Sequence, residues 1–163
     1  MKTSNKTAGN RFEQDLARKL SDIGFWVHVL QQNKAGQPAD LIVAKGAYTT
    51  LIDCKVISGD GGFPLSRVEE NQWHAMSRFC ERTCWSCWFA LKLPSEEIRF
   101  ISYSAIFAFR CYGIKQIPNE KILNCTLSMD EWICGAKRWA AMEETETDED
   151  GNQQCDTGEQ PNA

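Results

Sequence analysis

Two short apolar segments that carry charged side chains constrain this chain more than any other feature. Residues 37–43 (QPADLIV) and 51–55 (LIDCK) are rich in apolar and β-branched residues, so they predict the two strands of a hairpin. Asp40 begins the first strand, whereas Asp53 and Lys55 share one face of the second because side chains alternate along a strand. A buried carboxylate is normally paired or bound to a metal. The hairpin therefore predicts a site for a hard divalent cation and an activated water where these residues meet.

An Asp-x-Lys triplet alone is more often a surface ion pair than a functional site, so the flanking elements decide its interpretation. Apolar residues at helical spacing over residues 7–23, followed by Gly24, predict a helix. Glu13 falls at the edge of the buried stripe of this helix. A strand is predicted over residues 25–30, and the polar loop after it contains Lys34, which we expect to meet a phosphate.

A second helix is predicted over residues 66–82, because Ser66 and Glu69 have the spacing of a capping box. Gln72 falls on the otherwise apolar stripe of this helix, where a buried amide needs a partner. We expect Gln72 to point toward the carboxylates. Arg67 falls in the first helical turn, where its charge opposes the helix dipole, so we expect it to contact a ligand.

The later segments predict, in order, two strands, a short helix and an edge strand: residues 85–93, 98–103, 104–109 and 121–125. Ser128 and Glu131 predict a second capping box, which begins a helix that ends near Met142. The tryptophans lie in these periodic segments, where they are expected to belong to the core.

Charge is distributed unevenly along the 163 residues. Residues 143–163 hold eight of the 22 acidic residues and no Lys or Arg, a composition typical of disordered segments. Residues 1–142 therefore carry a net charge of about +4, which suits a polyanionic partner, and their number is enough for one core. We predict a single domain over residues 1–142 and a disordered acidic tail over residues 143–163.

Membrane insertion and disulfide formation are not expected. No apolar run approaches the length of a membrane span, and residues 1–10 lack the apolar stretch of a signal peptide. We therefore expect a cytoplasmic protein whose eight cysteines are reduced thiols. Cys80, Cys84 and Cys87 form one tight cluster, but a structural zinc ion needs a fourth ligand.

The ordered set of Glu13, Asp40, Asp53-x-Lys55 and Gln72 resembles the PD-(D/E)xK nuclease superfamily. This resemblance implies an α/β fold, with a mixed central β-sheet flanked by α-helices in a restriction-endonuclease-like core. It also implies metal-dependent hydrolysis of DNA phosphodiesters.

Within the superfamily, residues 45–48 (KGAY), 63–65 (FPL) and 67–72 (RVEENQ) look like the RecU-type Holliday junction resolvases, and the resemblance covers roughly residues 9–110. Asp53 stands where that family more often has Glu, and Asn71 stands where it commonly has His. The connection before Asp40 is shorter than the RecU stalk that helps to engage the junction. A compact viral or prophage-type resolvase, acting in a bacterial or phage-infected cell, fits that shortening.

The resemblance assigns metal binding to a set of oxygen ligands. Asp40, Asp53 and the backbone carbonyl of Cys54 would hold Mg²⁺, for which Mn²⁺ is expected to substitute. Glu13 would bind the water shell of this ion or a second ion.

The remaining roles concern water, phosphate and DNA. Lys55 would orient or help to deprotonate the attacking water, and Gln72 would hydrogen-bond the scissile phosphate or the water. Lys34 and Arg67 would contact DNA. Symmetric nicking of a four-way junction implies a homodimer with two-fold symmetry.

Three alternatives stay open from the sequence. A PD-(D/E)xK nuclease that acts on other duplex or branched DNA would have the same site. A DNA-binding protein without catalysis would need a broken site, yet every expected residue is present. A zinc or thiol protein would be built on Cys80, Cys84 and Cys87.

Overall fold

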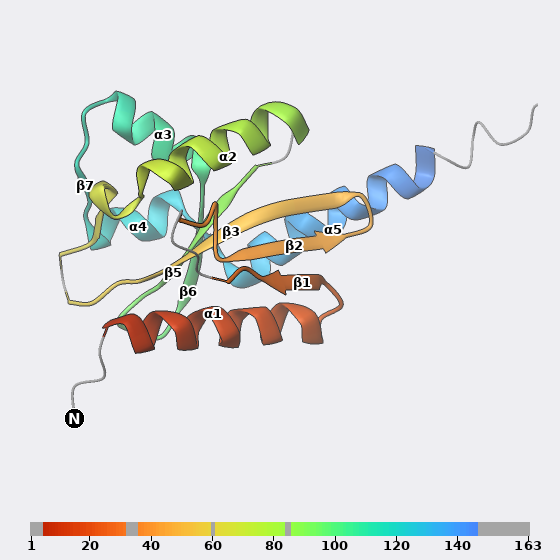
Figure 1. Ribbon diagram of the computed structural model, residues 1–163, viewed down its shortest axis with the longest axis horizontal. Helices are drawn as coiled ribbons and strands as arrows, with labels where there is room; N and C mark the ends of the chain where they lie inside the picture. The colour runs from red at the N-terminus through yellow and green to blue at the C-terminus, as the bar shows by residue number, and fades with distance from the viewer. Residues whose placement is uncertain (1–4, 32–35, 60, 84–85, 147–163) are drawn as a thin grey trace, which may run out of the picture.

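A six-stranded mixed sheet forms the centre of the molecule, with the strand order β1-β2-β3-β5-β6-β8 (Figure 1). The structure is a computed structural model and describes residues 5–31, 36–59, 61–83 and 86–146. The pairing of β3 with β5 is parallel, and the other neighbours in this sheet are antiparallel. The strands are β1 (Trp26–Val29), β2 (Leu41–Lys45), β3 (Tyr48–Val56), β5 (Trp88–Lys92), β6 (Ile98–Ser102) and β8 (Leu127–Ser128).

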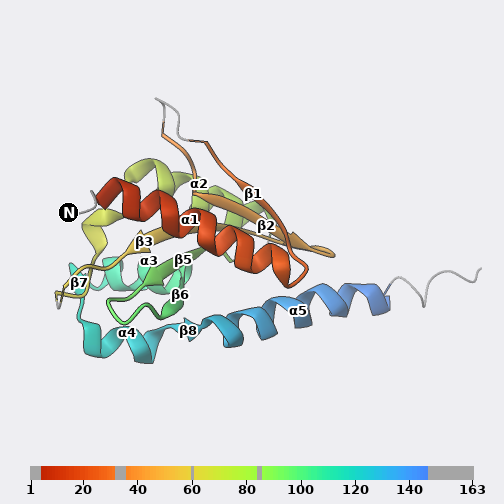
Figure 2. The same ribbon diagram turned by 90° about the horizontal axis from the view of Figure 1, so that it is seen from below.

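Helices cover both faces of this sheet (Figures 1 and 2). Apolar residues of α1 (Asn5–Asp22) and α5 (Met129–Glu146) pack on one face, where Trp132 stacks on Phe100 at 4.6 Å between ring centroids. Residues of α2 (Glu70–Thr83), α3 (Tyr103–Cys111) and α4 (Asn119–Cys125) pack on the other face. The central strands β3 and β5 are buried on both sides, which explains why their sequences are apolar runs rather than strict alternations.

The hairpin of β2 and β3 confirms the prediction made from the charged strands. Lys45 pairs with Tyr48 across a two-residue turn, and Leu41 pairs with Ile52 at the other end. Gly46 adopts a φ of 55° in this turn, a conformation that favours glycine. β3 and β5 are parallel, and α2 lies in the connection between them, as parallel strands require.

The start of the second helix was predicted wrongly. Residues 65–67 form a short 3-10 helix, η1 (Leu65–Arg67), and Val68 then has an extended backbone before α2 begins at Glu70. The side chain of Val68 is buried in the core, so core packing interrupts the helix that the Ser66–Glu69 spacing suggested. Arg67 therefore precedes α2 and does not lie in its first turn. A small two-stranded sheet of β4 (Phe63–Pro64) and β7 (Gln116–Ile117) lies beside this segment.

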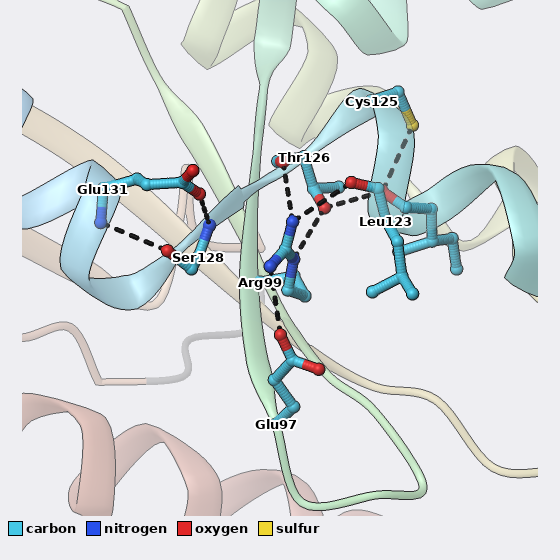
Figure 3. Close-up of polar contacts among 8 residues, drawn as sticks. Glu97, Arg99, Leu123, Cys125, Thr126, Ser128 and Glu131 are labelled. Carbon is cyan, nitrogen blue, oxygen red and sulfur yellow. Dashed lines mark hydrogen bonds and ion pairs between the residues drawn. The ribbon is translucent and has the colours of Figure 1, made fainter.

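The predicted edge strand over residues 121–125 is also wrong, because these residues belong to α4. Arg99 of β6 holds the end of this helix (Figure 3). Its Nη2 donates to the carbonyl oxygens of Leu123 at 3.1 Å and Thr126 at 2.9 Å, and its Nε donates to Thr126 Oγ1 at 3.0 Å. Glu97 Oε1 accepts from Arg99 Nη1 at 3.0 Å. A tertiary contact thus satisfies carbonyls that a helix end leaves free.

The capping box at the start of α5 is confirmed (Figure 3). The Ser128 N–H donates to Glu131 Oε2 at 2.6 Å, and the Glu131 N–H donates to Ser128 Oγ at 3.2 Å. The helix continues past Met142 to Glu146, beyond the sheet (Figure 2). The predicted tail falls largely on residues 147–163, which lie outside the described residues. No helix in the described ranges is long and apolar enough to cross a bilayer.

Candidate active site

Asp40 is held by backbone contacts at the start of β2. Its N–H donates to the carbonyl of Ile52 at 3.1 Å, and its carbonyl accepts from the Leu30 N–H at 2.8 Å. Its carboxylate reaches the neighbouring strand, where Oδ2 accepts from the Cys54 N–H at 2.6 Å. The other oxygen accepts from Gln37 Nε2 at 2.6 Å. Asp40 is therefore fixed beside the end of β3, as the hairpin predicts.

Asp53 and Lys55 project from the same face of β3, toward α2. Asp53 is fully buried, and the Lys55 ammonium lies 2.8 Å from its Oδ2. A contact of this length between an ammonium and a carboxylate is a charge-assisted interaction that holds the two side chains together. Cys54 lies on the opposite face, in the core beneath α1, and burial raises the pKa of its thiol well above the usual value. The thiol is therefore not available as a nucleophile.

Gln72 connects α2 to this pair. Asp53 and Lys55 are the partners that its buried amide requires. Its Nε2 donates a short hydrogen bond to Asp53 Oδ1, and its Oε1 accepts from Lys55 Nζ at 3.3 Å. The same Oε1 accepts from the Glu69 N–H at 3.1 Å. This last contact is the half of a capping box in which the third helical residue bonds back to the helix start. The start of α2 thus fixes the amide against Asp53.

An open pocket of about 470 Å³ joins these residues to α1. Glu13 of α1, Asp40, Lys55, Arg67 and Gln72 all line it. The Arg67 guanidinium is exposed and donates from Nη1 to the Val56 carbonyl at 2.7 Å, which places its charge at the pocket. The structure brings together all of the predicted site residues that it describes.

The chain matches a known family over most of its length. The sequence model described as archaeal Holliday junction resolvase (Hjc) matches residues 4–124. The chain belongs to the archaeal Holliday junction resolvase family. It is therefore a Holliday junction resolvase nuclease, an endodeoxyribonuclease of the crossover-junction class, and nucleases of this family are metal-dependent.

A solved structure shows the same fold. The chain is similar to Hjc, a Holliday junction resolvase of the archaeal hyperthermophile Archaeoglobus fulgidus, solved at 1.6 Å resolution, with a TM-score of 0.55 and 20% sequence identity. The match covers 73% of this chain and 93% of that chain. The predicted mixed sheet with flanking helices is thus the Hjc-like restriction-endonuclease fold. No curated protein matches this sequence.

Burial controls the protonation of the carboxyl groups in this pocket. It raises the pKa of Asp53 to about 7, although the Lys55 ammonium opposes the shift, and the Asp40 charge raises this pKa further. Burial also raises the pKa of Asp40, against the opposing effects of the Cys54 N–H and Lys55. The pKa of Glu13 is raised by burial and then by Asp40. A cation bound nearby would favour the ionised form of these carboxyl groups, because its charge offsets the cost of burying theirs.

The donor set fits a hard divalent cation. Asp40 and Asp53 both supply buried carboxylate oxygens. In the described part of the chain, no three His, Cys, Asp or Glu side chains are grouped as ligands of one metal ion. A site built on two carboxylates, with a backbone carbonyl and water, suits Mg²⁺, which keeps several waters and binds few carboxylates.

Two residues singled out from the sequence lie outside the described residues. Lys34 falls in residues 32–35, and Cys84 falls in residues 84–85. The other two cysteines of the predicted cluster are close, with Cys80 Sγ 3.7 Å from Cys87 Sγ.

The sequence analysis missed the residues that support Asp40. Gln37 donates to its carboxylate, and Asn71 Nδ2 donates to the Gln37 carbonyl at 2.8 Å. A Cβ on Gly36, where φ is 79°, would lie 2.5 Å from Asn71 Nδ2, so this close approach requires a glycine. The short spacing between Gln37 and Asp40 could have indicated their contact from the sequence. The contact with Asn71, in contrast, depends on the position of α2.

Proposed function

We propose that Asp40, Asp53, Lys55, Gln72 and Glu13 form the catalytic centre of this Holliday junction resolvase. The supporting observation is the geometry around Asp53, whose two oxygens contact Gln72 and Lys55 beside the fixed carboxylate of Asp40. A buried, strongly desolvated acid with specific partners in an open pocket is typical of a catalytic site.

In this proposal Asp40, Asp53 and the carbonyl of Cys54 bind Mg²⁺, and Mn²⁺ substitutes for it. When bound, the ion supplies Lewis-acid stabilisation of the phosphate and lowers the pKa of bound water. Glu13 hydrogen-bonds the water shell or contributes to a second ion. Hard oxygen ligands support the choice of Mg²⁺.

Lys55 and Gln72 act on the reacting groups. The Lys55 ammonium stabilises the negative charge that develops on the phosphate and orients the attacking water. Gln72 positions the water or a phosphate oxygen through its amide. Hydrolysis forms a bond between phosphorus and the water oxygen and breaks one bridging phosphorus–oxygen bond. The water loses a proton, and the leaving oxygen gains one to become a hydroxyl.

Arg67 and Lys34 supply DNA contacts, since most of the affinity for DNA comes from basic side chains on phosphates. The enzyme acts as a homodimer, because symmetric resolution cuts two strands related by a two-fold axis. Residues 1–142 form the nuclease domain, and residues 143–163 form an acidic tail.

Two finer predictions from the sequence stay predictions. The resemblance to RecU-type resolvases rests on residues 45–48, 63–65 and 67–72, whereas the matching family model describes archaeal Hjc enzymes. Action in the cytoplasm of a bacterial or phage-infected cell likewise stays a prediction.

Site-directed variants test the catalytic assignment. Asp40→Asn, Asp53→Asn and Lys55→Gln should each lower junction cleavage in Mg²⁺ by about 10²–10³-fold, the range seen when a group that stabilises transition-state charge is removed. Junction binding in EDTA should persist, because phosphate contacts remain. Asp15→Asn is the matched control, since Asp15 lies on α1 and pairs only with Arg11 and Arg18 in the described contacts. A folded Asp53→Asn enzyme that cuts like the control would refute the assignment.

A further inference from the structure

A second hollow adjoins the active-site pocket. It has a volume of about 420 Å³ and lies between α1, the end of β3 and the segment around β4. Gly9, Cys54 and Arg67 line both hollows, so the two spaces meet at these residues. Each volume lies in the range of about 300–1,000 Å³ that is usual for ligand sites.

The two hollows differ in charge. The active-site pocket is lined by Glu13, Asp40 and Glu69, with Asp53 behind them. Among the described residues that line the second hollow none is acidic, and the polar side chains there include Ser58, Arg67 and Gln116. A phosphate in the second hollow lies close to Arg67, whose positive charge attracts it.

Gly9 lies where the two hollows join, and neither backbone strain nor packing requires a glycine there. It belongs to α1, where a glycine costs about 0.5–1 kcal/mol of stability relative to alanine. A Cβ at this position would meet no atom within 4 Å. Gly9 precedes Glu13 by one helical turn, so both lie on the same face of α1. Its missing side chain leaves the passage between the hollows open.

From this geometry we propose that the two hollows form one groove for a single DNA strand, and that Gly9 is a positioning residue of this groove. The sugar–phosphate backbone next to the scissile phosphate crosses α1 at Gly9 and enters the second hollow, where Arg67 contacts a phosphate. The inference rests on the proposed function, since the active-site pocket defines where the scissile phosphate lies.

Side-chain size at Gly9 tests the groove. Gly9→Leu should lower kcat/KM for junction cleavage by about a hundredfold, the effect of misplacing a reacting group by about 1 Å. It should also weaken junction binding in EDTA, and Gly9→Ala should cause a smaller loss of both binding and cleavage. Gly9→Gln, which is polar and a good helix former, provides the same comparison if Gly9→Leu does not fold.

Gly135 offers a matched control. It lies in α5, a Cβ there would also meet no atom within 4 Å, and it lines neither hollow. Gly135→Leu should therefore cut and bind like wild type. The rise in melting temperature caused by Mg²⁺ should be unchanged in both leucine variants, which separates a blocked groove from a damaged metal site.

The outcomes are distinct. Loss of binding and cleavage that grows with side-chain size at Gly9 supports the groove. Folded Gly9→Leu and Gly9→Gln enzymes that bind and cut like Gly135→Leu would overturn it and leave the catalytic assignment intact. If wild type does not cut, the proposed catalytic centre fails, and binding in EDTA still decides for or against the groove.

Discussion

At the scale of single residues, Asp53 combines complete burial with contacts to the ammonium of Lys55 and the amide of Gln72. Its ion pair with Lys55 does not fully offset desolvation, so its pKa is raised to about 7. Such a group destabilises the fold when it ionises and is stabilised when a cation binds. The stability of the protein should therefore depend on pH and on a bound metal ion through the charge of Asp53.

The stability of the protein should depend on pH through Asp53. The unfolded chain releases this proton near the ordinary value of 3.8, whereas the folded protein holds it up to about pH 7. The folded state therefore binds more protons between these values, and the free energy of unfolding falls as pH rises across this window. Asp53→Asn removes this contribution.

Urea unfolding in EDTA checks this expectation. The variant Asp53→Asn should have a stability similar to that of wild type near pH 4. By pH 8 it should be more stable than wild type, with the gap on the order of a few kcal/mol. A gap that is the same at both pH values would contradict the raised pKa of Asp53.

Gln72 should matter for both stability and rate. Gln72→Ala removes the contacts to Asp53, Lys55 and the Glu69 N–H, so it should cost about 1–3 kcal/mol of stability. It should also lower kcat about 10–100-fold, as loss of a supporting contact does at metal sites. Unfolding and steady-state kinetics provide the two measurements.

Gln72→Glu separates these two roles. Glutamate still accepts from the Glu69 N–H, but when ionised it cannot donate to Asp53 and adds negative charge beside it. This variant should keep the contact at the helix start without recovering cleavage. Full activity of Gln72→Glu would show that the amide has no role in catalysis.

At the scale of elements, the strands were predictable and some helix boundaries were not. The Asp40 and Asp53 strands follow from apolar runs and alternation, which are local properties. The start of α2 depends on burial of Val68, and α4 depends on Arg99 from another strand. Neither tertiary contact is visible in the local sequence pattern. The grouping of the site residues was predictable because β3 and the start of α2 carry most of them. The position of Gly9 between the two hollows is visible only in the structure.

Arg99 tests the tertiary control of α4. Its planar guanidinium bonds two carbonyls and a hydroxyl at once, which the single ammonium of lysine does not reproduce. Both Arg99→Lys and Arg99→Ala should therefore lose about 1–3 kcal/mol of stability, measured by urea unfolding. Cleavage well below the melting temperature should be unchanged, since Arg99 lines neither hollow. A fully stable Arg99→Lys would contradict this account of why α4 is a helix.

At the scale of the whole molecule, a resolvase must cut two strands of one junction. In the proposed homodimer, each chain contributes one catalytic centre, and a two-fold axis relates the two centres. In enzyme reconstituted from equal amounts of wild type and Asp53→Asn, mixed dimers should nick one strand of a junction without making the paired cut. Single-turnover assays on junctions with two labelled strands measure this. Paired cuts by purified mixed dimers would contradict the two-centre arrangement.

The most direct test of the central claim is cleavage of a labelled four-way junction beside a matched linear duplex, in Mg²⁺ and in EDTA. We predict paired, symmetric nicks on the junction only, which require Mg²⁺ and are lost in Asp53→Asn. A folded protein that cuts neither substrate in Mg²⁺ or Mn²⁺, or whose cutting survives EDTA and Asp53→Asn, would contradict the claim that this pocket is a metal-dependent resolvase centre.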